Sequence, residues 1–115
     1  MEENLGKVTI AANVLVTIVQ KTAGSIPGVA RLVDHVPSVK RLLGLHTVGQ
    51  GVEVHVVDSQ VSVDVYLVAR RGVELLQLGR QIQREVSRAI LRIVGMDVWE
   101  VNVHIEDIAM DGPQD

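Results

Sequence analysis

Histidine and carboxylate side chains are the groups in this sequence best suited to chemistry, and most of them alternate with apolar residues. Because successive side chains of a strand point to opposite faces, this alternation gathers them on one polar face of a predicted sheet. Two histidines and three carboxylates on such a face could bind a divalent metal or perform acid/base chemistry. The seven candidates are Glu53, His55, Asp64, Tyr66, Glu100, Asn102 and His104.

The ordinary explanation of these residues is that one face of an antiparallel sheet is exposed to water. No two of them within one strand have a spacing diagnostic of a metal site, and His35 and His46 fall in an irregular segment. The chain has no cysteine, which excludes thiolate nucleophiles and thiolate metal ligands, and Ser87 lies in no nucleophile elbow. We therefore expect a protein that is not an enzyme, with no catalytic, cofactor-binding or metal-binding residues and no cofactor.

A long amphipathic helix that ends at Gly95 carries the feature to which we give most weight. Opposite its apolar stripe, Arg80, Arg84, Arg88 and Arg92 follow one another at intervals of four and form what we call the arginine ridge. Like charges at this spacing repel by roughly 0.2–0.5 kcal/mol per pair. A helix face that serves only solubility would normally mix Glu and Lys, so the ridge favours an acidic partner. The stripe consists of Leu75, Leu78, Ile82, Val86, Ala89, Ile90 and Ile93.

The net charge of −3 conceals two segments of opposite sign. Residues 70–92 carry six arginines against two glutamates, whereas residues 95–115 carry six acidic and no basic residues. Charge asymmetry of this kind concerns partners rather than fold. We expect one copy of the chain to offer its ridge to the acidic set of the next copy. The acidic set comprises Glu106, Asp107, Asp111 and Asp115.

The remaining segments predict short strands and one more helix. Alternation at Val8 and Ile10 predicts a first strand, and residues 12–23 predict a helix that buries Val14 and Ile18 among others. Gly79 lies inside the long helix, where glycine costs about 1 kcal/mol relative to alanine, so we expect a close approach to the sheet or first helix there. Other expected elements are a strand over 29–33, a short helix over 38–43 capped by Ser38 within an irregular segment 34–50, a hairpin over 52–67 turning at Asp58-Ser59, and a last strand with Trp99, Val101, Val103 and Ile105 on its apolar face.

The element order β-α-β-β-β-α-β predicts an α+β protein. With one apolar sheet face and two amphipathic helices, the expected solution is a two-layer sandwich, a mostly antiparallel sheet with both helices on one face. Residues 1–108 are expected to form this single domain, and residues 109–115 a flexible acidic tail. The predicted buried face comprises Val52, Val54, Val63, Val65, Val101 and Val103 beneath Ile18, Ile82, Val86 and Ile90.

Several short segments together resemble the signature of the alkaline shock protein family, a bacterial cell-envelope stress group. They are Ile82-Gln83-Arg84-Glu85-Val86, Gly95, Val101-Asn102-Val103-His104-Ile105 and Asp107-Ile108, preceded by Gly6, Val8, Ile10, Ile26-Pro27-Gly28-Val29, Gly51-Val52-Glu53-Val54 and Arg71-Gly72. The resemblance covers roughly residues 6–108. It departs from the family at Arg71, where an aromatic is usual, and at Ile93-Val94, where Met-Thr is usual. It implies a small α+β protein near the cytoplasmic membrane face that acts by association, with no catalytic residue to carry over.

We therefore expect a non-catalytic, self-associating scaffold in bacterial cell-envelope stress response or homeostasis. The N-terminus lacks an apolar signal core and no run approaches about 20 apolar residues, so we expect a cytoplasmic protein. Its expected partners are other copies of itself in an oligomer or filament, and a membrane-anchored protein or an anionic membrane surface. The alternative is a nucleic-acid-binding module that uses the ridge on phosphate, which the scarcity of aromatics (Tyr66 and Trp99) disfavours.

Overall fold

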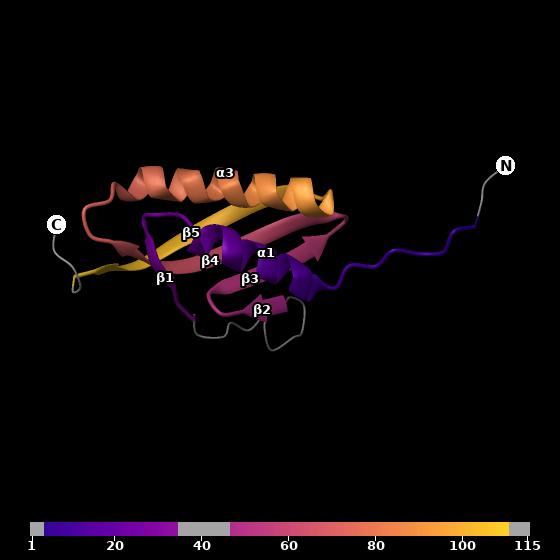
Figure 1. Cartoon of the computed structure of the whole chain (residues 1–115), viewed down its shortest axis with the longest axis horizontal. Helices are drawn as coiled ribbons and strands as arrows, with labels where there is room; N and C mark the ends of the chain where they lie inside the picture. The colour runs from indigo at the N-terminus through magenta and orange to yellow at the C-terminus, as the bar shows by residue number, and fades with distance from the viewer. Residues whose placement is uncertain (1–3, 35–46, 111–115) are drawn as a thin grey trace.

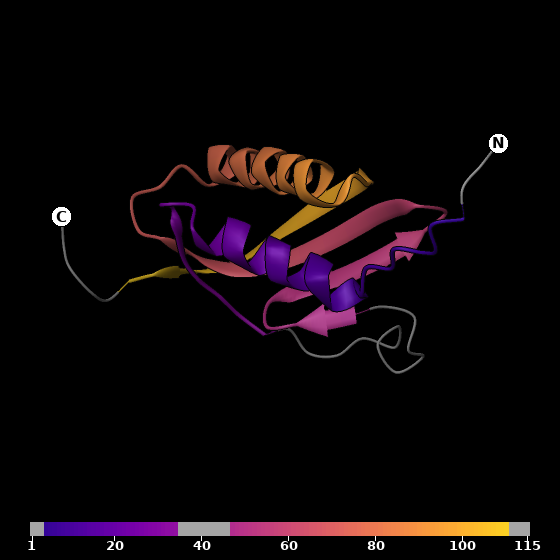
Figure 2. The same ribbon diagram turned by 45° about the vertical axis from the view of Figure 1, so that its right-hand side comes forward.

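Two helices cover one face of a five-stranded sheet, in a computed structural model that describes residues 4–34 and 47–110 (Figure 1). α1 and α3 lie side by side on the same side of the sheet (Figure 2). The expected α+β class, with two helices on one face of a mostly antiparallel sheet, is confirmed. The elements are α1 (Ala12–Gly24), β1 (Val29–Leu32), β2 (Thr47–Gly49), β3 (Val52–Val57), β4 (Gln60–Arg70), α3 (Leu75–Val94) and β5 (Asp97–Ala109).

β4 is the central strand of the sheet. Along one edge of β4, β3 pairs antiparallel with residues 60–65 and β1 pairs antiparallel with residues 67–69. β2 pairs antiparallel with the other edge of β3. The other edge of β4 pairs in parallel with β5 from Gln60 to Arg70. Parallel neighbours need a long crossover connection, which α3 provides. Among the described strands β5 pairs with β4 alone, so it forms an outer edge of the sheet.

The β3–β4 hairpin turns at Asp58 and Ser59, as predicted. Both residues have positive φ, 51° and 67°, which is the backbone of a two-residue turn whose twist matches that of the strands. This turn sets the register, so that Glu53 faces Asp64 and His55 faces Ser62 across the pair.

The core lies between the sheet and the two helices. The predicted buried face is confirmed, with Val103 half-buried and the other members buried. α1 and α3 contribute branched aliphatic side chains that pack against the valines of β3, β4 and β5. The largest fully buried side chains include Leu67, Ile82 and Ile90.

The strand predicted at Val8 and Ile10 is wrong. Residues 4–10 form no strand, and Val8 is 92% exposed. Two alternating apolar residues bury too little surface to offset the entropy of ordering a strand. The sheet instead gains β2, in a segment that was expected to be irregular.

Three residues expected on the apolar faces are exposed instead. Val14 is 42% exposed and Ile93 is 58% exposed. With 3.6 residues per turn, the core-facing residues at these places are instead Val16 in α1 and Val94 in α3. Trp99 is 69% exposed. The partner of Val61 is Val98 and the partner of Ser62 is Glu100, so Trp99 is the extra residue of a β-bulge and leaves the alternation.

The close approach expected at Gly79 is also wrong, since a Cβ built there meets no heavy atom within 4 Å. Gly79→Ala is therefore expected to raise the free energy of unfolding by about 1 kcal/mol, the helix-propensity difference between the two residues. Urea denaturation of both proteins at low concentration measures it. A loss of stability would contradict the open surroundings of this residue.

Some predictions fall outside the described residues. These concern the short helix over 38–43, His35, His46, Asp111 and Asp115. β5 continues through Ala109, one residue into the expected tail, and the division into domain and tail stays a prediction. In the described part of the chain, no helix has the length and apolarity needed to cross a bilayer.

Candidate functional site

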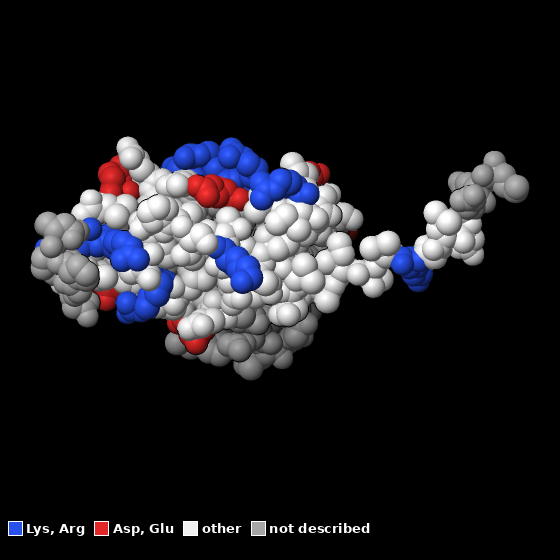
Figure 3. All heavy atoms as spheres, viewed as in Figure 1, with Lys and Arg blue, Asp and Glu red and all other residues white. Residues whose placement is uncertain are grey.

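The arginine ridge forms an exposed positive band along α3. Arg80, Arg84, Arg88 and Arg92 are all exposed, and basic side chains gather over α3 in Figure 3. Arg80 Nη1 donates a hydrogen bond to Gln83 Oε1 at 3.1 Å. Within residues 4–34 and 47–110, none of the four forms a salt bridge. The ridge is thus not neutralised within the described part of its own chain.

Two hollows, which we call the α3–β5 hollows, lie between the helix and the edge strand. The one beside the start of α3 measures about 340 Å³, and the one beside its end about 520 Å³. Between helix and strand, Gln83 Nε2 donates to the carbonyl oxygen of Val101 at 3.1 Å. Three ridge arginines border the hollows. The first hollow is lined by Leu75, Leu76, Gly79, Arg80, Gln83, Val103 and Ile105, and the second by Arg84, Ser87, Arg88, Leu91, Asp97 and Val98.

Exposed apolar side chains accompany the arginines. Leu76 and Leu91, which line the hollows, are 66% and 54% exposed. Leu76 lines the first hollow and Leu91 the second, so each hollow combines an exposed apolar side chain with ridge arginines. The adjoining β5 is a 13-residue edge strand, and an edge strand offers backbone groups to another chain. Basic, apolar and backbone groups therefore meet on this side of the molecule.

The structure places Glu106 and Asp107 near the end of β5, where both are exposed. Ile105, just before them, borders the first hollow together with Leu75. Asp107 Oδ1 accepts a hydrogen bond from the Ile108 amide at 2.8 Å. Glu106 and Asp107 therefore lie on β5, whereas the arginine ridge lies on α3.

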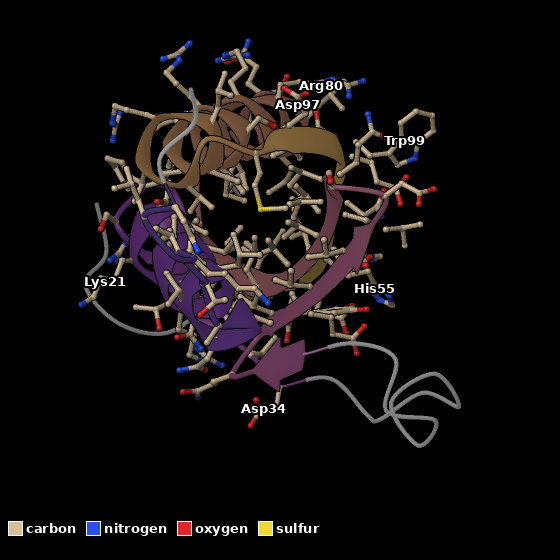
Figure 4. The ribbon with its side chains drawn as sticks, turned by 90° about the vertical axis from the view of Figure 1, so that its right-hand side faces the viewer. Lys21, Asp34, His55, Arg80, Asp97 and Trp99 are labelled. Carbon is tan, nitrogen blue, oxygen red and sulfur yellow. The ribbon has the colours of Figure 1, made fainter. Side chains whose placement is uncertain are left out.

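A second cluster lies on the opposite, outer face of the sheet. The β3–β4 register brings candidate ligand atoms of Glu53, His55 and Asp64 within 4.8 Å of one another. Glu53 is 8% exposed, whereas His55 and Asp64 are half-buried. Figure 4 shows His55 pointing away from the helices.

His104 of β5 contacts Asp64, a member of this cluster, and the neighbouring Tyr66. Its Nε2 donates to Asp64 Oδ1 at 2.8 Å, and its ring stacks on Tyr66 with centroids 4.4 Å apart. Burial raises the pKa of the Tyr66 hydroxyl to about 12, and nearby carboxylates add to the rise. Both effects favour the protonated hydroxyl of Tyr66. The carboxylates are Glu53, Asp64 and Glu106.

The remaining two candidates of this face line an open depression of about 480 Å³, together with His55 and Asp64. Glu100 Oε2 accepts a hydrogen bond from Ser62 Oγ at 2.8 Å. Asn102 lies directly opposite Asp64 across the β4–β5 pair. The exposed Trp99 borders the same depression, so neither aromatic residue of this chain lines the α3–β5 hollows.

Comparison with known proteins addresses the resemblance drawn from the sequence. Residues 1–110 match the model of the alkaline shock protein family, which is described as having a cell envelope-related function. The chain belongs to the alkaline shock protein family. This confirms the resemblance. Membership of the alkaline shock protein family agrees with 30% identity over 111 residues to YqhY of Bacillus subtilis (strain 168), covering 96% of this chain and 82% of YqhY. Spy1614 of Streptococcus pyogenes serotype M6 is 28% identical over 110 residues, covering 93% and 91%.

Solved structures resemble this alkaline shock family chain in fold. Two variants of MamM-CTD align with TM-scores of 0.52 and 0.51. Their sequence identities are 13% and 14%, and the alignments cover 84% and 83% of this chain and 98% and 93% of theirs. At such low identity the likeness shows the fold alone.

The sequence located the ridge of this alkaline shock family protein but missed two features. It did not reveal the exposed apolar residues Leu76 and Leu91 beside the ridge. It also did not single out Glu53, His55 and Asp64 from the other polar residues of the outer face. The second feature could have been found from the two-residue turn. Counting outward from this turn along both strands places Glu53 opposite Asp64.

Proposed function

We propose that this protein is a non-catalytic scaffold that assembles with itself at the cytoplasmic face of the membrane, in bacterial envelope stress response or homeostasis. The observation that carries the proposal is the arginine ridge, which lies beside exposed apolar residues and an edge strand and forms no salt bridge within the described residues. The envelope-related function of the alkaline shock protein family supports the setting.

The proposed occupant of this surface is a second copy of the chain. Its acidic set, Glu106 and Asp107 with Asp111 and Asp115, has the charge complementary to the ridge. The ridge lies on α3 and the described acids at the end of β5, so the contact joins two different surfaces. A contact of this heterologous kind propagates into rings or filaments.

Apolar burial and charge contribute differently to this assembly. Burial of side chains such as Leu76 and Leu91 stabilises the contact by about 25 cal/mol per Å² of apolar surface. An exposed ion pair contributes only about 0–1 kcal/mol. The arginines therefore act chiefly on orientation and association rate.

The ridge also suits an anionic membrane surface, where a basic residue close to the lipid contributes about 1 kcal/mol. A membrane of this kind would compete with the acidic set for the same arginines. We propose that the ridge binds either another copy of the chain or a partner at the membrane, which is an anionic lipid surface or a membrane-anchored protein. The choice between these partners links self-assembly to the envelope.

Self-association is expected to weaken with salt, because the Debye length falls from about 10 Å at 0.1 M to about 3 Å at 1 M ionic strength. Light scattering across this series measures it. The Arg84→Glu, Arg88→Glu variant is expected to assemble less at every salt concentration. Lys21→Glu, Arg31→Glu is the matched control, since it makes the same charge change at exposed positions on α1 and β1.

A rescue variant sharpens this experiment. Glu106→Arg, Asp107→Arg, mixed with Arg84→Glu, Arg88→Glu, should restore complementary charge and assembly between the two chains. A wild type that stays monomeric at low salt, or a ridge variant that assembles like the wild type, contradicts the proposal. Nucleic acid that co-purifies with the wild type and is lost from the ridge variant would favour the nucleic-acid alternative.

A further inference from the structure

In place of the sequence-based expectation of no metal-binding residues, we infer that Glu53, His55 and Asp64 form a binding site for a divalent transition-metal cation of the Zn²⁺ class on the outer face of the sheet. The three residues come from neighbouring strands, β3 and β4, whose register is set by the tight turn at Asp58 and Ser59. The site lies on the face opposite α3, so the inference is independent of the proposed assembly.

The geometry is close to that of a metal site. The candidate ligand atoms lie within 4.8 Å of one another. Nitrogen and oxygen ligands bind Zn²⁺ at about 2.0–2.2 Å, which places tetrahedral ligands roughly 3.4 Å apart. Side-chain rotations that move each ligand atom by about 1 Å therefore close the site. Such rotations leave the hydrogen-bonded backbone of the two strands in place.

Electrostatics also favour a cation between these residues. Glu53 lies directly opposite Asp64, so a cation between the two strands is attracted by both carboxylates. Glu53 is in addition only 8% exposed, and the attraction between a carboxylate and a cation is stronger where water is excluded.

His104 acts as a positioning residue for the site. Its Nε2 donates a hydrogen bond to Asp64 Oδ1 at 2.8 Å, which orients the Asp64 carboxylate. Stacking on Tyr66 holds the imidazole ring in place. Metal-binding carboxylates are commonly hydrogen-bonded in this way, and loss of such a partner costs about 10–100-fold in metal affinity.

The open depression beside the cluster gives a cation access, and the imidazole of His55 determines which ions bind. His55 and Asp64 line it, so a cation can reach them from solvent, and water can occupy the coordination positions that the protein leaves open. The imidazole of His55 favours Zn²⁺, Co²⁺ or Ni²⁺ over Mg²⁺ and Ca²⁺, which prefer oxygen ligands.

Isothermal titration of the full chain with Zn²⁺ tests the inference. We expect one ion per chain in the wild type, unaffected by excess Mg²⁺, and binding at least about 100-fold weaker in His55→Gln. His104→Gln should weaken binding by about 10–100-fold while the stoichiometry is kept. Replacement of Zn²⁺ by Co²⁺ gives an absorption spectrum that reports the coordination of His55 independently of heat.

Two controls separate this site from other polar groups. Glu100→Gln removes a carboxylate from the same face outside the cluster and should bind like the wild type. His35→Gln, His46→Gln removes the two other histidines of the chain and should also bind one ion. Circular dichroism verifies that every variant is folded. Asp64→Asn, which removes the charge of one proposed ligand, should also weaken binding. If that variant does not fold, His55→Gln still decides, because His55 is half-buried.

The inference is overturned if the wild type takes up no stoichiometric Zn²⁺. Equal affinity in the wild type and His55→Gln also overturns it. So does a result in which His35→Gln, His46→Gln loses the ion and His55→Gln keeps it. A Zn²⁺ concentration that just saturates the wild type should also raise its Tm and should raise that of His55→Gln much less, because an ion stabilises the folded state in proportion to how tightly it binds there.

Discussion

Replacement of Val86 by aspartate is expected to unfold the domain. Val86 is completely buried in α3, with the buried Ile82 and Ile90 one turn away on either side. The substitution removes an apolar side chain from the core and leaves an uncompensated carboxylate there. Such a change costs several kcal/mol, a large part of the roughly 5–15 kcal/mol that stabilises a typical domain.

Thermal unfolding followed by circular dichroism measures this effect. Leu91→Asp is the matched control, because it places the same side chain on the same helix at a position that is 54% exposed. We expect the control to fold and to lose only association. A Val86→Asp protein with the Tm of the wild type would contradict the packing of α3 on the sheet.

Gly51→Ala is expected to lower the free energy of unfolding by about 3 kcal/mol or more. Gly51 has a φ of +73°, and an added Cβ would lie 2.7 Å from Leu32 Cβ. It would also lie 3.1 Å from the Tyr66 carbonyl oxygen and the Val33 amide nitrogen. These two atoms hydrogen-bond each other at 2.9 Å, so the methyl group would disturb the junction of three sheet segments.

Gly72→Ala isolates the backbone contribution to this loss. Gly72 has a φ of +90° with no heavy atom within 4 Å of the added Cβ, so its replacement costs only the left-handed conformation, about 1–2 kcal/mol. Chemical denaturation of both variants gives the difference, which measures the steric clash at Gly51. Equal losses in the two variants would mean that the neighbours of Gly51 move aside freely.

The two proposals for this protein can fail separately. Assembly is assigned to α3 and the end of β5, whereas the cation site lies on the outer face of β3 and β4. A ridge variant that no longer assembles should therefore bind Zn²⁺ normally, and His55→Gln should assemble normally.

Regular spacing along the chain was sufficient to predict most of the elements. The period of 3.6 in α1 and α3 and the period of two in β3 and β4 gave the correct types, and the alternation gave the buried face of the sheet. Spacing failed at the strand predicted around Val8 and Ile10, where too little apolar surface is available, and at single residues that depart from the pattern of their element. Trp99 is the extra residue of a β-bulge and so interrupts the alternation of β5. At the end of α3, Val94 packs against the core and Ile93 does not.

The sequence by itself determined the α+β class, the arginine ridge and the family resemblance, because these depend on local periodicity and on residue identity. Only the tertiary structure decided that β5 pairs in parallel with β4, that the α3–β5 hollows adjoin the ridge, and that Glu53, His55 and Asp64 meet. The first two depend on how β5 and α3 lie against β4, a strand distant from them in the chain, whereas the third depends on the register of the β3–β4 hairpin, which its two-residue turn sets. A shift of one residue in that register would move every side chain of a strand to the other face.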